Sequence, residues 1–404
     1  MNIHRNSVYL LVVAVIGLIV LGLVMLSSTA GYARESGGNA SILVQKQAVW
    51  LAVGALVCMA AAMLDYHRWA QTWWVWFALS VVLLTLCFIP PIGHRINGSA
   101  RWLRVAGLSF QPSELAKLAT VIALAWWFSR GTGRPASRSS LTNEPPADAR
   151  SERVEQTFLK GFLIPLAGVS VLMALIFREE DLGATALLGS TTLILMFVAG
   201  TRWRYLAPTV LLGVAGLVLA VKFIPERMGR ILAFLHPELY PDDAYQQLMG
   251  LIALGSGGVE GFGLGLGRQK IEYLPFAHTD FIFPVIGEEL GLRCTLAVVF
   301  AFLLIILSGS VIAIRARDRF GMLLGFGIVT LIALQAAVNI GVTTMVLPNK
   351  GMPLPFISYG GSNLAFCLVC TGILINIWRR GVSDKEEKAN VHLTVRTRRK
   401  PVRI

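Results

Sequence analysis

Long apolar runs divide the chain into segments that match the thickness of a lipid bilayer. Ten runs can each provide about 20 residues, the length that a helix needs to cross the hydrocarbon core, with modest tilt or adjustment at the ends. Lipid cannot satisfy free backbone groups, which excludes an open sheet, and unbroken runs favour helices over the alternating strands of a barrel. The pattern predicts an all-α polytopic membrane protein with ten transmembrane helices. The runs cover residues 8–28, 48–64, 72–91, 113–129, 160–177, 182–199, 205–224, 282–309, 321–346 and 363–378.

The composition agrees with a membrane protein and excludes a set of soluble domains. The 404 residues are 55% hydrophobic and only 15% charged, with a mean hydropathy of +0.65, whereas a soluble domain carries about 25% charge. The first run, Val8 to Ser28, is longer than the core of a signal peptide, which predicts a retained first helix. The net charge of +13 fits basic loops that touch anionic lipid. No basic–aromatic motif indicates a nucleic-acid partner.

The basic residues predict which side of the membrane each segment occupies. With the N-terminus inside, 22 of the 36 Lys and Arg residues fall in inner segments, so both termini are expected in the cytoplasm. We therefore expect one membrane domain over residues 1–380, followed by a basic cytoplasmic tail over 381–404. Residues 130–159 have the Pro, Ser and charge content of a disordered cytoplasmic loop. Residues 225–280 form a long extracytoplasmic loop between helices 7 and 8, which we expect to be folded and functional.

Ionisable residues at membrane depth are costly and usually mark functional sites. Glu114 and Lys117, in QPSELAKLA (111–119), lie on one helix face. They form either a structural ion pair or the charged wall of a polar cavity. Asp280, in HTDFIFPVIGEELG (278–291), stands where the long outer loop meets an apolar run. Its carboxylate either caps that helix or serves in acid–base chemistry at the membrane surface.

Polar and basic residues also gather on the outer side. The loop LPNKGMPLPFISYGGS (347–362) is stiffened by prolines and offers hydroxyl donors, so it either packs as a re-entrant turn or holds a headgroup. The positive-inside rule should deplete this side of basic residues, yet several occur there. An anionic ligand explains them, and a lipid-linked pyrophosphate would place phosphate at this depth. The basic residues are Arg95, Arg101, Arg104, Arg227, Arg230, Arg268, Lys270 and Lys350.

Motifs for cofactors are missing from the sequence. The glycine run 255–267 lacks the G-x-G-x-x-G spacing of a dinucleotide site, and no Walker A motif occurs, so we expect no nucleotide or organic cofactor. Cys367 and Cys370 form a C-x-x-C inside an apolar run without a second ligand pair, which argues against a metal there. The five cysteines lie in or beside apolar runs, which argues against a disulfide framework.

Seven stretches together resemble the SEDS family, the membrane glycosyltransferases of bacterial cell walls. They occur in the order and spacing of the family over about residues 8–380, and two of them are more similar to its division branch than to its elongation branch: IGEELG and the Lys350-Gly351 step. Two positions depart from the family pattern, because Glu180 stands where Pro is common and Phe276 where Glu is common. The stretches are NGSARWL (97–103), QPSELAKL (111–118), DLGAT (181–185), RILAFLHP (230–237), AYQ (244–246), KIEYLPFAHTDFIFPVIGEELG (270–291) and NKGMPLPFISYGGS (349–362).

The resemblance implies a multi-pass enzyme of the bacterial cytoplasmic membrane that polymerises lipid II into glycan strands during septal wall synthesis. Lipid II is an undecaprenyl-pyrophosphate-linked disaccharide peptide. The implied partners are a class B penicillin-binding protein and other membrane proteins of the division complex. Asp280 matches the essential aspartate of the family. The resemblance implies that Glu114 and Lys117 form a cavity pair and that Arg101 and the loop with Ser358, Tyr359, Gly360, Gly361 and Ser362 line the outer side. We also expect His278 and three of the outer basic residues, Arg230, Lys270 and Lys350, at the substrate.

The expected chemistry is an inverting glycosyl transfer with Asp280 as general base. The charge of the leaving pyrophosphate must be stabilised by Arg and Lys or by a divalent cation such as Mg²⁺ or Mn²⁺. A lipid II flippase or transporter is the alternative, because ten spans with charged groups suit it too. The two halves show no convincing repeat, and Asp280 lies at the outer rim rather than at the midplane, which disfavours transport. A scaffold without chemistry would leave the outer basic residues unexplained.

Overall fold

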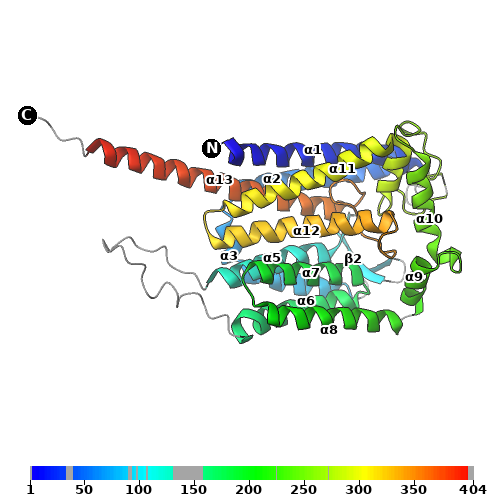
Figure 1. Ribbon diagram of the computed structural model, residues 1–404, viewed down its shortest axis with the longest axis horizontal. Coiled ribbons are helices and arrows are strands. Elements are labelled where there is room, and N and C mark those ends of the chain that lie inside the picture. The colour runs from blue at the N-terminus through cyan, green and yellow to red at the C-terminus, as the bar shows by residue number, and fades with distance from the viewer. Residues whose placement is uncertain are drawn as a thin grey trace, which may run out of the picture.

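The computed structural model describes residues 2–32, 40–89, 93–96, 99–105, 108–130, 158–223, 225–271 and 273–398. Its long helices lie side by side in one bundle (Figure 1), with α9, α10 and the strands at the end opposite the start of α1. The helices are α1 Asn2–Thr29, η1 Ala30–Tyr32, α2 Ala40–Met63, α3 His67–Gln71, α4 Trp73–Leu86, α5 Pro112–Ser129, η5 Leu159–Leu163, α6 Ile164–Arg178, α7 Leu182–Val198, α8 Trp203–Lys222, α9 Pro225–Leu235, α10 Pro241–Ser256, α11 Ile282–Ile314, α12 Arg319–Thr343 and α13 Gly361–Arg398. The strands are β1 Gly93–Ile96, β2 Ser99–Val105 and β3 Leu108–Phe110.

A helix occupies each of the ten apolar runs, so the prediction of a helical polytopic membrane protein is confirmed. Within the described ranges, seven helical segments are long and apolar enough to cross a bilayer, and α4 and α7 are apolar but shorter. A helix satisfies its backbone hydrogen bonds within its own segment, which is what lipid requires. The number of membrane crossings stays a prediction, because length and composition alone single out fewer than ten.

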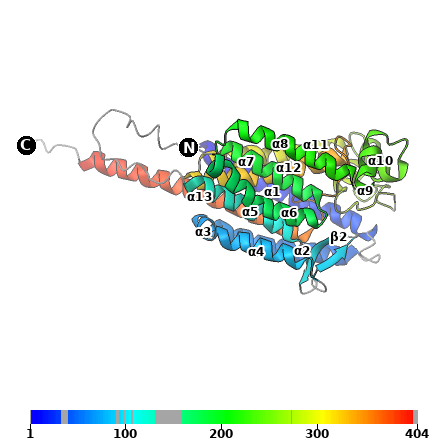
Figure 2. The same cartoon turned by 90° about the horizontal axis from the view of Figure 1, so that it is seen from below.

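The prediction of an all-α fold is wrong for residues 93–110, which contain a three-stranded antiparallel sheet of order β1-β2-β3. Gly93 pairs with Leu103 of β2, and Leu103 pairs with Phe110 of β3. The sheet lies at one end of the bundle beside the end of α4 (Figure 2). This stretch is too short and too polar for a membrane helix, and at the end of the bundle the edges of a sheet can be satisfied by water.

The last helix, the predicted inner loop and the predicted outer loop can be compared with the structure only in part. Helix α13 continues to Arg398, well past the expected end of the last run at residue 378, and so enters the predicted basic tail. Residues 131–157 of the predicted disordered loop, and residues 399–404 of the tail, lie outside the described residues. The segment 225–280 contains two helices, α9 and α10, that cover one end of the bundle.

Helix α11 is interrupted at Gly291, which has a left-handed backbone with φ of 73°. The interruption frees helix carbonyls, and the glycine-rich segment after α10 pairs with them. Phe262 N–H donates to the carbonyl of Glu288, and Gly263 N–H donates to that of Glu289, both at 2.9 Å. In return, Leu292 N–H donates to the carbonyl of Gly258 at 3.0 Å. The kink therefore fixes the segment that leads to Asp280.

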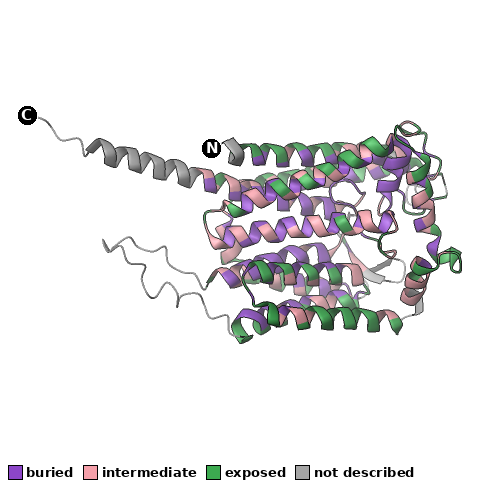
Figure 3. Ribbon diagram, viewed as in Figure 1, coloured by how far each residue is buried: buried purple, intermediate pink, exposed green. Residues whose placement is uncertain are grey.

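Helix α8 stands at the edge of the bundle and is exposed along most of its length (Figure 3). Leu211 and Leu212 are 70% and 72% exposed, and of its residues only Leu206 is buried. The other helices bury a continuous apolar core. Where small residues allow it, their backbones come close: Gly372 of α13 packs against the backbone of Cys58 on α2. Because α8 buries so little of its surface against the bundle, space remains between α8, α7 and α12.

Candidate functional site

Asp280 ends the loop that precedes α11 and lies, half-buried, against the loop after α12. A Cβ atom at Gly351 would come within 2.6 Å of Asp280 Oδ2, so the carboxylate rests directly on this glycine. Asn339 of α12 fixes both loops, because its Nδ2 donates to the carbonyls of Asp280 at 2.8 Å and of Met352 at 2.6 Å. Helix α11 begins at the N-cap residue Phe281 without a side-chain cap, so the Asp280 carboxylate does not cap this helix.

The loop 347–362 is held in place by the residues that the sequence singled out. Ser358 Oγ donates to the carbonyl of Thr279 at 2.6 Å and accepts the N–H of Leu354 at 2.8 Å. Tyr359 N–H donates to the carbonyl of His278 at 3.0 Å, and the two rings lie 5.8 Å apart. These hydrogen bonds join the loop 347–362 to the residues directly before Asp280; they involve Ser358, Tyr359 and His278.

The last residues of this loop connect it to α2 and to β3. Gly360 N–H donates to Gln47 Oε1 at 3.3 Å, and Gly361 packs so closely on Trp50 that no Cβ would fit there. Ser362 Oγ donates to the carbonyl of Ser109 at 3.1 Å and accepts the N–H of Gln111, also at 3.1 Å. Gly360, Gly361 and Ser362 therefore act on the shape of the loop, and none of them lines the cavity described below.

A second aspartate, Asp181, joins two cations beside Asp280. Lys350 Nζ lies 3.5 Å from Asp181 Oδ1, and an Arg101 Nη atom lies 3.9 Å from Asp181 Oδ2. Arg101 also donates to the carbonyls of Glu179 at 3.1 Å and Glu180 at 2.9 Å. Three separate chain segments, from β2, the start of α7 and the loop after α12, meet in this network.

Burial and charge shift the acidity of these groups in different directions. Burial raises the pKa of Asp280 to about 6, the negative charge of Asp181 adds to the rise, and Lys350 and Arg101 oppose it. Burial also acts to raise the pKa of Asp181, but the same two cations hold that pKa below its ordinary value. Burial raises the pKa of Glu179 to about 8. At neutral pH Asp280 is therefore ionised and is the stronger base of the two aspartates.

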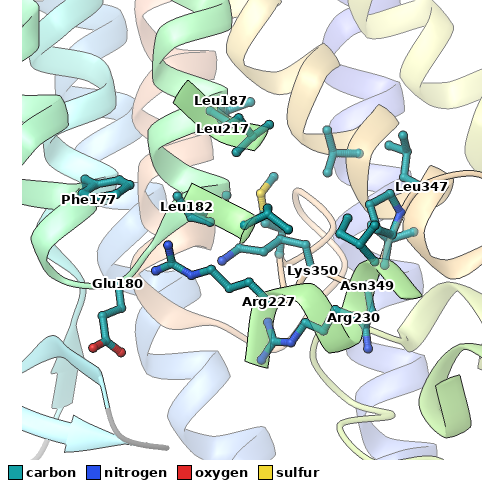
Figure 4. Close-up of a pocket in the computed structure, with 18 of the residues that line it drawn as sticks. Phe177, Glu180, Leu182, Leu187, Leu217, Arg227, Arg230, Leu347, Asn349 and Lys350 are labelled. Carbon is teal, nitrogen blue, oxygen red and sulfur yellow. The ribbon is translucent and has the colours of Figure 1, made fainter. Parts of the chain in front are cut away.

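A cavity of about 1170 Å³ opens beside this network, between α7, α8, α9, α12 and the loop after α12. Figure 4 shows Lys350, Arg227 and Arg230 on one side of it and Leu187 and Leu217 on the other. From Leu182 to Ser190 the lining follows α7 for about 12 Å at the rise of a helix. Its basic residues are Arg101, Arg178, Arg227, Arg230 and Lys350. Its apolar residues include Leu187, Leu217, Val221, Leu334, Val338 and Val342.

Such a cavity suits an amphiphile with an anionic head. Arginine binds phosphate through a two-pronged fork and lysine as a point charge, and both occur at one end. The aliphatic side chains further along α7, α8 and α12 provide the environment of a lipid chain. The exposed side chain of Glu180 is the one acidic side chain among the lining residues, and in Figure 4 it points away from the basic group.

The structure places Glu114 and Lys117 in the interior of the bundle. Their side chains are 2.8 Å apart and only 3–6% exposed. Lys117 Nζ also donates to Gln335 Oε1 at 3.0 Å, and Asn363 Nδ2 donates to Glu114 Oε2 at 3.2 Å. Gln335 Nε2 in turn donates to the carbonyl of Pro353 at 3.0 Å. The pair does not line the cavity; it joins α5, α12, α13 and the loop after α12.

Lys270 is likewise turned inward. Its ammonium lies 2.6 Å from Glu289 Oε1 and donates to Ser28 Oγ at 2.7 Å and to the carbonyl of Gly265 at 2.9 Å. Both charged side chains are essentially buried. Of the residues predicted at the substrate, Arg101, Arg230 and Lys350 therefore line the cavity, whereas Lys270 fixes the loop to α11 and α1.

Sequence reasoning missed Asp181, Gly351 and Arg178 as members of the site. Asp181 had a signal, because it opens the stretch DLGAT, but its ion pairs depend on contacts between distant segments. The two departures from the family pattern, Glu180 and Phe276, both have left-handed backbones, with φ of 64° and 56°. Proline cannot adopt such an angle, so the turn before α7 needs a residue other than proline in this chain.

A divalent cation usually takes several carboxylate or imidazole ligands from a protein. Within the described ranges, no group of three His, Cys, Asp or Glu side chains lies close enough to hold a metal ion. Near the cavity, both oxygens of Asp181 already face Lys350 and Arg101. The expected divalent cation therefore stays a prediction, and the reaction steps below are derived from the protein's own side chains.

Comparison with known proteins gives consistent matches. A family model described as a cell cycle protein, and covering FtsW, RodA and SpoVE, matches residues 9–382. The chain is 37% identical to a protein of Geobacter metallireducens named as a probable peptidoglycan glycosyltransferase FtsW, across 94% of this chain and 96% of that protein. It is 34% identical to the stage V sporulation protein E of Bacillus subtilis, across 92% and 96% of the two chains.

Two solved structures are similar over nearly the whole chain. One belongs to a peptidoglycan synthase complex described as coordinating polymerization and crosslinking, with a TM-score of 0.69 and 26% identity across 92% of this chain and 97% of that chain. The other is the rod shape determining protein RodA of Thermus thermophilus, with a TM-score of 0.64 and 25% identity across 91% and 95%.

Proposed function

Because the chain belongs to the FtsW, RodA and SpoVE family of cell cycle proteins, we propose that it is a membrane glycosyltransferase that polymerises lipid II into the glycan strands of peptidoglycan. One observation carries this proposal: the half-buried carboxylate of Asp280 rests on Gly351, whose two chain neighbours, Lys350 and Met352, line a cavity that is basic at its rim and apolar further in. Lipid II has a pyrophosphate and a polyprenyl chain that match these two parts. A pyrophosphate among arginines and a lysine would lie close to Asp280, a carboxylate whose pKa burial raises to about 6.

The proposed reaction is a direct displacement. The 4-hydroxyl of a GlcNAc on the acceptor attacks the anomeric carbon of MurNAc on the donor, and Asp280 accepts the hydroxyl proton as general base. The bond from the anomeric carbon to pyrophosphate breaks, and one displacement converts the α-linkage into a β-linkage. Lys350, Arg227 and Arg230 stabilise the charge that develops on the leaving pyrophosphate.

The orientation, the partner and the cellular role are part of the proposal. We infer ten crossings with both termini in the cytoplasm, which places α9, α10 and the cavity rim on the outer side; the basic residue count supports this. A class B penicillin-binding protein is the expected partner, supported by the similarity to a chain of a peptidoglycan synthase complex. A role at the septum is supported by relatives named FtsW.

Purified protein, reconstituted into vesicles with its class B penicillin-binding protein, tests the function. We expect lipid II supplied on the outer leaflet to be converted into long glycan strands, visible on gels and cleavable by a muramidase. A flippase is less favoured, because the charged site lies at one end of the bundle and transporter sites usually lie near the midplane. Labelled lipid II that crosses the bilayer without forming polymer would replace the proposal by the flippase.

Gly351→Ala is expected to lower the rate of polymerisation about 100-fold, because the new methyl group would meet Asp280 Oδ2 at 2.6 Å and push the carboxylate aside. The measurement is the initial rate of glycan formation at saturating lipid II. Gly213→Ala on α8 is the control, since a Cβ there meets no atom within 4 Å. Equal rates in the two variants would show that the position of the carboxylate on Gly351 is unimportant.

A further inference from the structure

Asp181 is the one aspartate of the charged network that the proposed reaction does not use. Its side chain is only 8% exposed, and it forms the N-cap of α7, with Oδ1 accepting the N–H of Ala184 at 3.1 Å. The same oxygen lies 3.5 Å from Lys350 Nζ, and Oδ2 lies 3.9 Å from Arg101. A simple helix cap needs one oxygen and no cation. The carboxylate of Asp181 instead faces two cations, Lys350 and Arg101.

Each of the two cations also contacts the chain directly before or after Asp181, so more than one contact fixes its position. Arg101 donates to the carbonyls of Glu179 and Glu180, the residues directly before Asp181. The stem of Lys350 packs on the first turn of α7, because a Cβ at Gly183 would come within 2.5 Å of Lys350 Cε. The first turn of α7 and the two residues before it therefore decide where both positive charges lie.

Lys350 connects the start of α7 to the proposed general base, Asp280. The next residue, Gly351, supports the carboxylate of Asp280, so Lys350 and Gly351 lie between the start of α7 and the general base. The ionised side chains around Asp280 are Asp181, Lys350 and Arg101, with Arg230 acting on Lys350 from α9. Glu179, buried beside them, is largely neutral at pH 7. Without Asp181, the carboxylate of Asp280 would face two positive charges with nothing to offset them.

We propose that Asp181 is a positioning residue, which holds Lys350 and Arg101 at the cavity rim and offsets one of their two charges so that Asp280 works as the proton acceptor. This inference rests on the proposed function. Asp181 itself touches neither the reacting hydroxyl nor the anomeric carbon. Its effect passes through the position of the two cations and through the electrostatic field at Asp280.

The pH dependence of polymerisation tests the proposal. A general base must be deprotonated, so the wild-type rate is expected to fall as the pH drops through the pKa of Asp280 at about 6. Asp181→Asn keeps a helix cap but removes the charge. We expect it to move this acid limb about one pH unit lower and to reduce the plateau rate about tenfold, because the base becomes weaker. Asp181→Ala should give the same limb together with a lower melting temperature.

Asp318→Asn is the matched control, because Asp318 caps α12 at the opposite end of the bundle by accepting the N–H groups of Phe320 and Gly321. Its acid limb is expected to match the wild type. If Asp181→Asn shows the same acid limb of the pH profile and the same plateau rate as the wild type, Asp181 acts only as the N-cap of α7 and the proposal is overturned. If that variant binds lipid II but makes no polymer, Asp181→Glu decides: the retained charge should restore part of the rate, and no recovery overturns the proposal. Full polymerisation by an enzyme that lacks the Asp280 carboxylate would instead overturn the proposed function.

Discussion

Asp280→Asn is expected to lower the rate of glycan polymerisation by about 10³-fold, while the protein still folds and binds lipid II. Asparagine has nearly the same size and can rest on Gly351 as the carboxylate does. It cannot accept the proton of the attacking hydroxyl, and loss of a general base costs about 10² to 10⁴ in rate. The basic rim and the apolar part of the cavity stay intact, so binding should be kept. The measurement is glycan formation from purified lipid II, paired with a binding assay on the same sample.

The control for this experiment is Glu260→Gln, which removes another carboxylate of the same segment. Glu260 is 77% exposed and pairs with Arg293 at 3.3 Å, away from the lining of the cavity. A surface pair contributes little to stability. We expect this variant to polymerise lipid II at the wild-type rate. A normal rate for Asp280→Asn would remove Asp280 from the mechanism, whatever the control does.

The helices were predictable from the sequence because lipid imposes a simple rule on length and polarity. Asp280 could be singled out from the sequence as a carboxylate at the border between a long outer loop and an apolar run, and its role as general base, which the resemblance implies, stays a prediction. The sheet over residues 93–110 was missed, because its strands are short and lie outside the apolar runs that carry the signal. The interruption of α11 at Gly291 was missed as well, since its cause is a segment about 30 residues earlier in the chain.

The direction in which a charged side chain points could not be read from the sequence. Lys270 and Lys350 both stand in segments predicted on the outer side near Asp280, yet Lys270 is buried against Glu289 and Lys350 lines the cavity. The difference depends on which segments meet in space. Asp181 shows the same limit: its position at the start of an apolar run indicates a helix cap, and only the folded chain brings Lys350 and Arg101 to its two oxygens.

The sequence left open whether Glu114 and Lys117 form a structural ion pair or the charged wall of a cavity, and their buried contacts now allow a test. Lys117→Met is expected to lower the free energy of unfolding by about 3–5 kcal/mol, because it leaves the carboxylate of Glu114 buried without its partner. Asn363 still donates to the carboxylate of Glu114, but an amide cannot replace a positive charge. The measurement is thermal unfolding of the purified protein in detergent, followed by the fluorescence of its tryptophans.

The double variant Glu114→Gln with Lys117→Met separates a structural pair from a charged wall of a substrate cavity. Removal of both charges leaves no uncompensated ion in the interior, so most of the lost stability should return. A structural pair predicts this recovery, together with lipid II binding close to that of the wild type. If Lys117→Met instead keeps its melting temperature but loses lipid II binding, the pair contacts substrate, and the bundle must open between α5 and α12 to let the substrate reach it.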